Sequence, residues 1–401
     1  MKRAYKVLPV YAGDVSGCCS ALYELGGMVI IHDPSGCNST YNTHDEVRWD
    51  KLESLIFISG LTDVDAITGD DKKLIDEIVD AAMIHKPKFI AIANSPIPYV
   101  NGTDFDYISK EVNRQTGIKT FAVKTNAFHD YVKGASKAFF AVAENLVGGD
   151  EQKDDRDNIK TCNKINEKNC EVEKIKINII GTTPLDFTEN EVKYIRDFFT
   201  DKGFEIISNW SYGSSLEDIA KSANADVNVV VSSTGLLAAK SLYEKYNIPY
   251  VVGLPIGIMG DIMVSYIREA INDNKPRISY LDGMESNKKI NNNKGKSFDD
   301  IIVGEAVFAG SLSAALGCND GKKISVCVST ESDVELVREG DFCIQSEEEI
   351  ETLLSKAKKI WGDPVFKHIA PREAEFVGIS HFGLSGRLYT NTHKSIFDMG
   401  D

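Results

Sequence analysis

The stretch "GGMVIIHDPSGCNST", residues 26–40, places an apolar run directly before a loop of Pro, Ser and Gly. The run "MVIIH" has the β-branched content of a strand buried in a parallel sheet. Loops that follow such strands form the ligand-binding edge of an α/β sheet. Cys37 lies in this loop, and its residue type allows three roles: a buried core residue, a nucleophile or a metal ligand.

The first 150 residues repeat this alternation of strand and helix. Short apolar runs at 54–59, 88–94 and 119–124 are separated by segments with helical periodicity. The helical pattern over 104–117 ends in glycine, which is a frequent helix C-cap. We therefore predict a first α/β domain over residues 1–150, which carries the candidate cysteines and the dimer contact.

Two polar segments divide the rest of the chain. Residues 151–174 and 281–299 are dense in charged and amide side chains and offer little to bury, so we predict that both are linkers. Strand and helix patterns resume after each, which predicts further α/β domains over 175–280 and 300–401. The predicted fold class is α/β, with three Rossmann-like doubly wound domains built on parallel sheets.

The composition excludes several classes of function. The 401 residues are 42% apolar and carry a formal net charge of −15, which argues against sequence-independent binding of nucleic acid and against docking on an anionic membrane. The N-terminus lacks the apolar core of a signal peptide, and we expect a cytoplasmic protein. The segment "NKGKS" at 293–297 lacks the upstream glycine of a P-loop, so we predict no ATP site there.

The cysteines near the N-terminus are the candidate chemical groups. We expect Cys19 to open a short helix, whose dipole would favour the thiolate. As a nucleophile, Cys37 would need a base, and His32 and His44 are near it in sequence. As metal ligands, one chain supplies two of the four thiolates that an iron–sulfur cubane usually takes, and a symmetric dimer would supply four.

Several segments, in order along the chain, resemble proteins of the nitrogenase component 1 family. The segment "HDPSGC" at 32–37 resembles the "HGPxGC" segment of that family, with Asp33 in place of the usual glycine. The other similar segments are residues 61–81, 87–112, 244–269, 302–316 and 381–389. The resemblance therefore covers nearly the whole chain.

This resemblance implies three Rossmann-like domains per subunit, a cluster at a subunit interface and electron donation by a separate ATP-dependent iron protein. Nitrogen-fixing members use a third cluster cysteine, which would fall at Ser95. Cys37 and Cys19 remain, with Cys18 as the alternative to Cys19, so the resemblance implies a homodimer that shares one [4Fe–4S] cluster. Ser95 could lend an oxygen ligand, and a heteromer with a related subunit stays open.

The cofactor cysteine of nitrogen-fixing members would fall near Ser232 and Ser233, so the resemblance implies a reductase with a substrate other than dinitrogen. Smaller family members reduce tetrapyrroles, and we expect an unidentified small molecule, tetrapyrrole-like among the candidates. The residues that we expect to donate protons or to line the substrate cleft are His44, Arg48, His381 and Arg387.

Two other functions compete with the reductase. A non-catalytic scaffold would hold an iron–sulfur or metallocofactor during its assembly, as some relatives do. A ligand-binding α/β protein without metal is the third hypothesis. Proton donors in the cleft, and turnover with reductant and iron protein, would distinguish the reductase from the scaffold.

Overall fold

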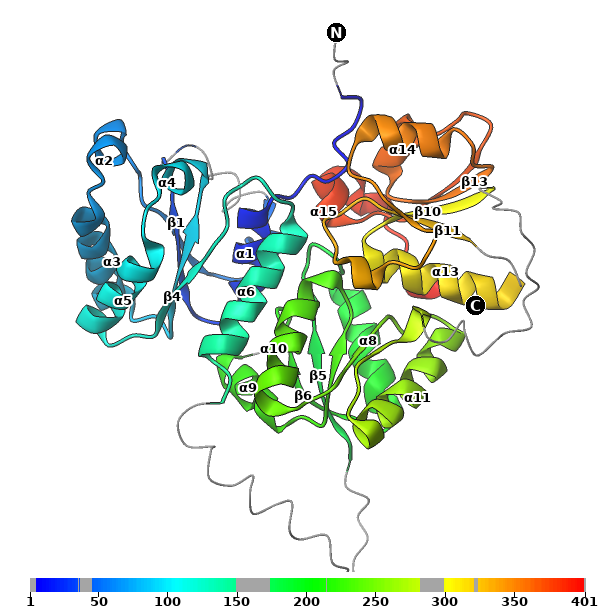
Figure 1. Ribbon diagram of the computed structural model, residues 1–401, viewed down its shortest axis with the longest axis horizontal. Coiled ribbons are helices and arrows are strands. Elements are labelled where there is room, and N and C mark those ends of the chain that lie inside the picture. The colour runs from blue at the N-terminus through cyan, green and yellow to red at the C-terminus, as the bar shows by residue number, and fades with distance from the viewer. Residues whose placement is uncertain are drawn as a thin grey trace, which may run out of the picture.

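The computed structural model describes residues 5–34, 36, 45–148, 174–213, 215–281, 299–320 and 324–399, without the side chains of residues 319 and 320. Within these ranges the chain forms three parallel β-sheets, each flanked by helices (Figure 1). This confirms the predicted α/β class with three doubly wound units. We call them the first, second and third units, in chain order.

The first unit is built on the sheet β2-β1-β3-β4. Its strands, whose apolar content the sequence patterns indicated, are β1 (Met28–His32), β2 (Leu55–Ile58), β3 (Ile90–Asn94) and β4 (Thr120–Val123). Its helices are α1 (Asp14–Leu22), α2 (Asp63–Thr68), α3 (Asp71–His85), α4 (Pro96–Asn101), α5 (Phe105–Thr116) and α6 (Tyr131–Asn145). Helix α5 ends at the predicted glycine, Gly117, which has a φ of 70° that favours glycine.

The second unit is built on the sheet β6-β5-β7-β8-β9 and the third on β12-β11-β10-β13-β14. The second contains β5 (Lys176–Ile180), α8 (Glu189–Asp201), β6 (Glu205–Asn209), α9 (Leu216–Ala220), β7 (Val227–Val230), α10 (Leu236–Tyr246), β8 (Tyr250–Val252), α11 (Ile258–Asp273) and β9 (Arg277–Ile278). The third contains β10 (Asp300–Gly304), α13 (Ala306–Asp320), β11 (Ser325–Val328), β12 (Phe342–Cys343), α14 (Glu347–Leu354), β13 (Lys359–Gly362), β14 (Glu375–Gly378) and α15 (Phe382–Ser385). None of the described helices has both the length and the apolar content needed to cross a bilayer.

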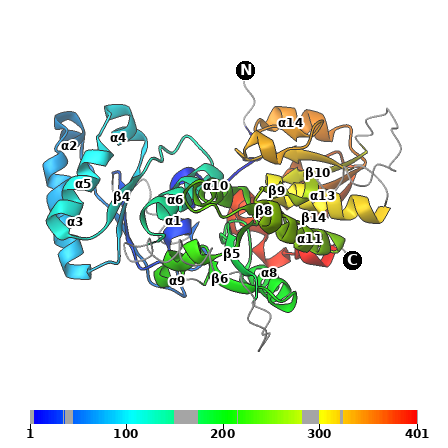
Figure 2. The same ribbon diagram turned by 60° about the horizontal axis from the view of Figure 1, so that its bottom comes forward.

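Helices α1 and α6 cross in unusually close contact at the centre of the molecule (Figure 2). A Cβ atom on Gly17 would lie 2.1 Å from the carbonyl oxygen of Tyr131, and one on Gly134 would lie 1.8 Å from that of Asp14. Only glycine fits at either position, because any side chain would overlap backbone atoms. Helix α6 also packs against α10, so it joins the first unit to the second.

Both ends of the described chain cross from one unit to another. The backbone N–H of Val7 donates to Glu347 of α14 over 2.6 Å, and that of Ala12 donates to the carbonyl oxygen of Gly383 over 3.0 Å. The segment before α1 therefore lies on the third unit (Figure 1). Near the other end, Phe397 stacks on Tyr194 of α8 with 4.3 Å between ring centres, which holds the end of the third unit on the second.

Candidate functional site

The sheet topology marks three edges where ligands are expected. The strand order reverses between β1 and β3, between β5 and β7, and between β10 and β13. Open α/β sheets bind ligands beyond the carboxyl ends of such strand pairs. The first pair carries the candidate cluster residues, whereas residues after the other two pairs meet where the three units join.

The edge of the first sheet brings Ser95 beside the loop that contains Cys37. The Ser95 hydroxyl lies 2.7 Å from the carbonyl oxygen of His32 and 2.6 Å from the Asp33 carboxylate. Nδ1 of His32 lies 2.7 Å from the hydroxyl of Ser59, and burial lowers the pKa of His32 to about 4. The imidazole is therefore neutral at pH 7, and the Ser95 hydroxyl already has hydrogen-bond partners in the chain.

The structure corrects the predicted position of Cys19. Helix α1 begins at Asp14, so Cys19 is the sixth helical residue rather than the first. Cys18 and Cys19 are both fully buried, and burial raises the pKa of each thiol. The expected stabilisation of a thiolate by the helix N-terminus is therefore wrong for Cys19. Cys37 and His44 lie outside the described residues.

The two adjacent thiols have different electrostatic surroundings. Beyond burial, the carboxylate of Asp14 raises the pKa of Cys18. The neighbouring Cys18 and the carboxylate of Glu46 raise the pKa of Cys19. Glu46 is the second residue after the segment 37–44, which lies outside the described residues. Of the two thiols, Cys19 is the one whose pKa the carboxylate of Glu46 raises.

Arg48 lies in the interior rather than in a substrate cleft. Its guanidinium is 2% exposed and pairs with Glu46 over 2.6 Å and with Glu24 over 2.7 Å. It also donates to the carbonyl oxygens of Ser20, over 2.7 Å, and Ser211, over 3.3 Å. Since Ser211 belongs to the second unit, Arg48 joins the end of α1 to that unit, and its donors are already used.

The other two cleft candidates come from the third unit. Arg387 donates to the backbone oxygen of Glu46 over 3.2 Å, which brings it to the described end of the first unit's loop. His381 lies apart from that contact, with Nε2 3.3 Å from the Asp186 carboxylate. The structure therefore separates these two residues into different surroundings.

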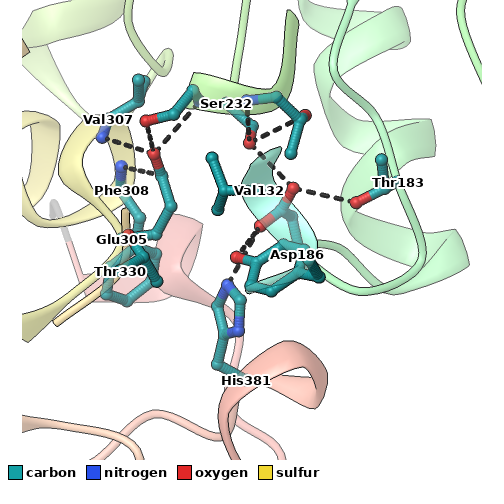
Figure 3. A network of polar contacts seen from close by, with 12 residues as sticks. Val132, Thr183, Asp186, Ser232, Glu305, Val307, Phe308, Thr330 and His381 are labelled. Atoms are coloured by element: carbon teal, nitrogen blue, oxygen red, sulfur yellow. Dashed lines mark hydrogen bonds and ion pairs between the residues drawn. The ribbon is translucent and has the colours of Figure 1, made fainter. Parts of the chain in front are cut away.

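The place where the three units join is a buried polar network, which we call the junction (Figure 3). Asp186, from the loop after β5, is its centre and receives three hydroxyl groups besides His381. The hydroxyl of Tyr131 donates over 2.6 Å, and those of Thr183 and Ser232 donate over 2.8 Å each. Tyr131 comes from the first unit, so one carboxylate connects all three units.

A second buried carboxylate, Glu305, lies in the same junction at the start of α13. It accepts from the backbone N–H groups of Ser233, Val307 and Phe308 over 2.9 to 3.1 Å, and from the hydroxyl of Ser233. Burial, followed by the negative charge of Asp186, raises the pKa of Glu305. Sequence reasoning missed Asp186 and Glu305, although Glu305 directly follows the apolar strand β10, which is the available signal.

The outer face of the first unit has an acidic cavity beside exposed apolar side chains. The cavity, of about 460 Å³, is lined by His32, Leu61 and the loops around α2 and α4. Four carboxylates line it: Asp65, Asp70, Asp71 and Asp104. Ile67 on α2 and Val100 on α4 are 85% and 75% exposed.

The fold and these sites define a three-unit α/β protein with polar groups at the carboxyl edges of its sheets. The chain belongs to the nitrogenase component 1 type oxidoreductases, whose family model matches residues 15–330. The resemblance found in the sequence is thus confirmed.

Known relatives include proteins with different roles. The nitrogenase iron-molybdenum cofactor biosynthesis protein NifE of Methanosarcina barkeri is 26% identical over 248 residues, which cover 60% of this chain and 50% of that protein. A component of the light-independent protochlorophyllide reductase of Leptolyngbya boryana is 32% identical over 111 residues, covering 27% of this chain and 22% of that one. The chain spans about half the length of the NifE relatives it matches.

A solved structure shares the fold over nearly the whole of this chain. The structure of nitrogenase Cp1 at pH 6.5 matches with a TM-score of 0.65 and 15% sequence identity, covering 99% of this chain and 90% of that chain. At this identity the likeness supports the arrangement of the three units and nothing finer.

Proposed function

We propose that the chain is a nitrogenase-like reductase subunit that holds a [4Fe–4S] cluster at the contact between two copies of itself. The observation that carries the proposal is the geometry of the first edge. Asp33, before the segment with Cys37, accepts from the hydroxyl of Ser95 over 2.6 Å, and the carboxylate of Glu46, after that segment, raises the pKa of Cys19. Cys19 and Cys37 would be the ligands from each chain, with Cys18 as the alternative to Cys19.

The residues of this edge fit an iron–sulfur cluster in their chemistry. Thiolates are the usual ligands of such clusters, and two per chain give four in a dimer. The buried thiols have raised pKa values and are therefore protonated at pH 7, so binding must release protons. When bound, the cluster would supply one-electron transfer, while the chain's own residues position it and the substrate.

The outer face of the first unit is the surface we propose for the electron donor. Its exposed aliphatic side chains, Ile67 and Val100, suit a protein partner, and the four aspartates of the neighbouring cavity suit a partner with a basic rim. We propose that the partner is an ATP-dependent iron protein. The substrate would be a small molecule, with tetrapyrroles as one candidate class.

A scaffold for cofactor assembly is the second candidate function. The long matches to NifE proteins favour it, since these are named as cofactor biosynthesis proteins. The two functions differ in the step after reduction. A reductase turns over a substrate when it is given iron protein and ATP, whereas a scaffold passes its cluster to an acceptor protein without turnover.

The first experiment is anaerobic purification with iron and sulfide analysis, EPR after dithionite, and mass in solution. We expect about four irons per dimer in the wild type. Cys37→Ala and Cys19→Ala should lose them, whereas Cys18→Ala, a change of the neighbouring buried thiol, should retain them. Iron in all three variants, or a chain that takes up no cluster on reconstitution, would contradict the proposal.

A further inference from the structure

The polar atoms of the junction are not equally satisfied. Asp186 has four polar partners, the hydroxyl groups of Tyr131, Thr183 and Ser232 and the Nε2 atom of His381. His381 uses Nε2 for this contact, whereas its Nδ1, although buried, has no hydrogen-bond partner among the described residues. A carboxylate that fixes one imidazole nitrogen and leaves the other open is the arrangement that prepares a histidine for proton transfer.

The carboxyl groups around His381 raise the pKa of its imidazole. Burial alone would lower the pKa of His381, but the hydrogen bond and charge of Asp186 raise it, as do the carboxylates of Asp363 and Glu305, so that the pKa lies above its usual value. The ring centre of Tyr131 lies 6.1 Å from that of His381. Its hydroxyl donates to Oδ1 of Asp186, the oxygen that also contacts His381. The histidine thus faces three carboxyl groups, and burial raises the pKa of two of them, Glu305 and Asp363.

Tyr131 connects this histidine to the cysteine helix. Its backbone meets Gly17 of α1, next to Cys18 in the chain, so closely that a Cβ on Gly17 would overlap it. Its hydroxyl ends 2.6 Å from Oδ1 of Asp186, the same oxygen that holds His381. The fully buried Tyr131 therefore reaches from α1, the helix with Cys18 and Cys19, to the pair formed by Asp186 and His381.

We propose that His381, positioned by Asp186, takes up one proton from solvent for each electron that the first unit accepts, and releases it from Nδ1 when the electron passes to substrate. The electron comes from the iron protein or another reductant, and the N–H bond of His381 is the bond that forms and breaks. The inference rests on the proposed function, because it requires a redox centre at α1. The negative charge added there favours the imidazolium, which offsets it.

The test needs no substrate. The midpoint potential of the reconstituted protein, followed by EPR in dye-mediated titrations, should become more negative by up to about 59 mV per pH unit, the value for one proton per electron. Asp186→Asn and His381→Gln should flatten this slope. Tyr131→Phe, which keeps the ring and loses only the hydroxyl, should shift the pH range of the slope. Asp333→Asn, a half-exposed carboxylate that pairs with Lys133 nearby, should leave it unchanged.

A second measurement uses the cluster-free full-length chain. Nitrogen-15 NMR of labelled histidine should show a pKa for His381 that is higher in the wild type than in Asp186→Asn. A cluster whose potential does not depend on pH would overturn this inference and leave the proposed function intact. A chain that takes up no cluster would overturn both. A slope that persists in Asp186→Asn and His381→Gln would assign the proton to another group.

Discussion

The edge of the first sheet and the junction of the three units occupy equivalent places in the fold but differ in how their polar groups are satisfied. At the junction, Asp186 and Glu305 receive donors from all sides within the chain. At the first edge, burial holds the pKa values of two thiols above their usual range, and apolar side chains on α2 and α4 face outward. The chain itself supplies the partners of both junction carboxylates and leaves Nδ1 of His381 without one among the described residues, whereas we propose that other molecules complete the first edge.

The largest expected effect concerns Arg48, which fastens α1 to the second unit. Arg48→Leu should lower the free energy of unfolding by about 3–5 kcal/mol, because Glu24 and Glu46 would lose their buried partner. Urea denaturation measures it. The matched control, Arg372→Leu, changes an exposed arginine and should stay within about 0.5 kcal/mol. Equal losses of unfolding free energy in the two variants would show that Arg48 does not stabilise the contact between α1 and the second unit.

The next effect tests, through pH, the contact of Asp130 with the third unit, where its carboxylate accepts from the backbone N–H of Glu331 over 2.6 Å. Burial raises the pKa of Asp130 from 3.8 to about 6. The folded state therefore binds more protons than the unfolded state between these values, and the stability that is present below pH 3.8 falls as pH rises to about 6. The full loss is about 3 kcal/mol. Asp130→Asn, which keeps a good N-cap, should remove this pH dependence. Parallel curves of unfolding free energy against pH for both proteins would contradict it.

A smaller effect compares two replacements of Glu305. Glu305→Ala should cost about 1–3 kcal/mol, because buried N–H groups that the carboxylate accepts would lose their partner. Glu305→Gln keeps an acceptor oxygen and should cost less, since the raised pKa favours an uncharged side chain. Thermal unfolding of both variants at pH 7 measures the difference. If Glu305→Gln lowered stability as much as Glu305→Ala, the negative charge itself would be required.

The smallest effect on stability is expected at the outer face of the first unit. Ile67→Asp combined with Val100→Asp should change the free energy of unfolding by less than about 0.5 kcal/mol, because both side chains are largely exposed. The same pair should weaken binding of the iron protein that we propose as electron donor about tenfold or more, which corresponds to about 1.4 kcal/mol. Ile84→Asp, on the exposed side of α3, is the control for surface charge. Unchanged binding of the double variant would exclude this face.

The strands and the order of the units could be predicted from sequence because buried parallel strands are short apolar runs. The start of α1 could not. The sequence analysis predicted that Cys19 opens the helix, but α1 begins at Asp14 and contains Gly17, where only glycine admits the backbone of α6. Tertiary packing overrode the local signal, and the argument for Cys19 at a helix N-terminus failed with it.

The candidate site was predictable in part for a similar reason. Ser95 and Asp33 follow neighbouring strands, and the carboxyl ends of such strands meet, so their contact follows from the pattern. Arg48 was expected to line the substrate cleft, because its contact with Ser211, 163 residues away in the chain, cannot be seen in the local sequence. The contacts that connect Asp186 to Tyr131 and His381 join three units, and no local pattern indicates which polar residues will meet across such distances.

The segment before α1 has a consequence for how the protein is made. Val7 and Ala12 are synthesised early, but their partners Glu347 and Gly383 are added some 340 to 370 residues later. At ribosomal speeds of about 5–20 residues per second, this delay is roughly 20 to 75 s. The cysteine helix therefore leaves the ribosome long before the contacts that anchor its leading segment can form. Docking of residues 7–12 on the third unit must thus be a late step of folding.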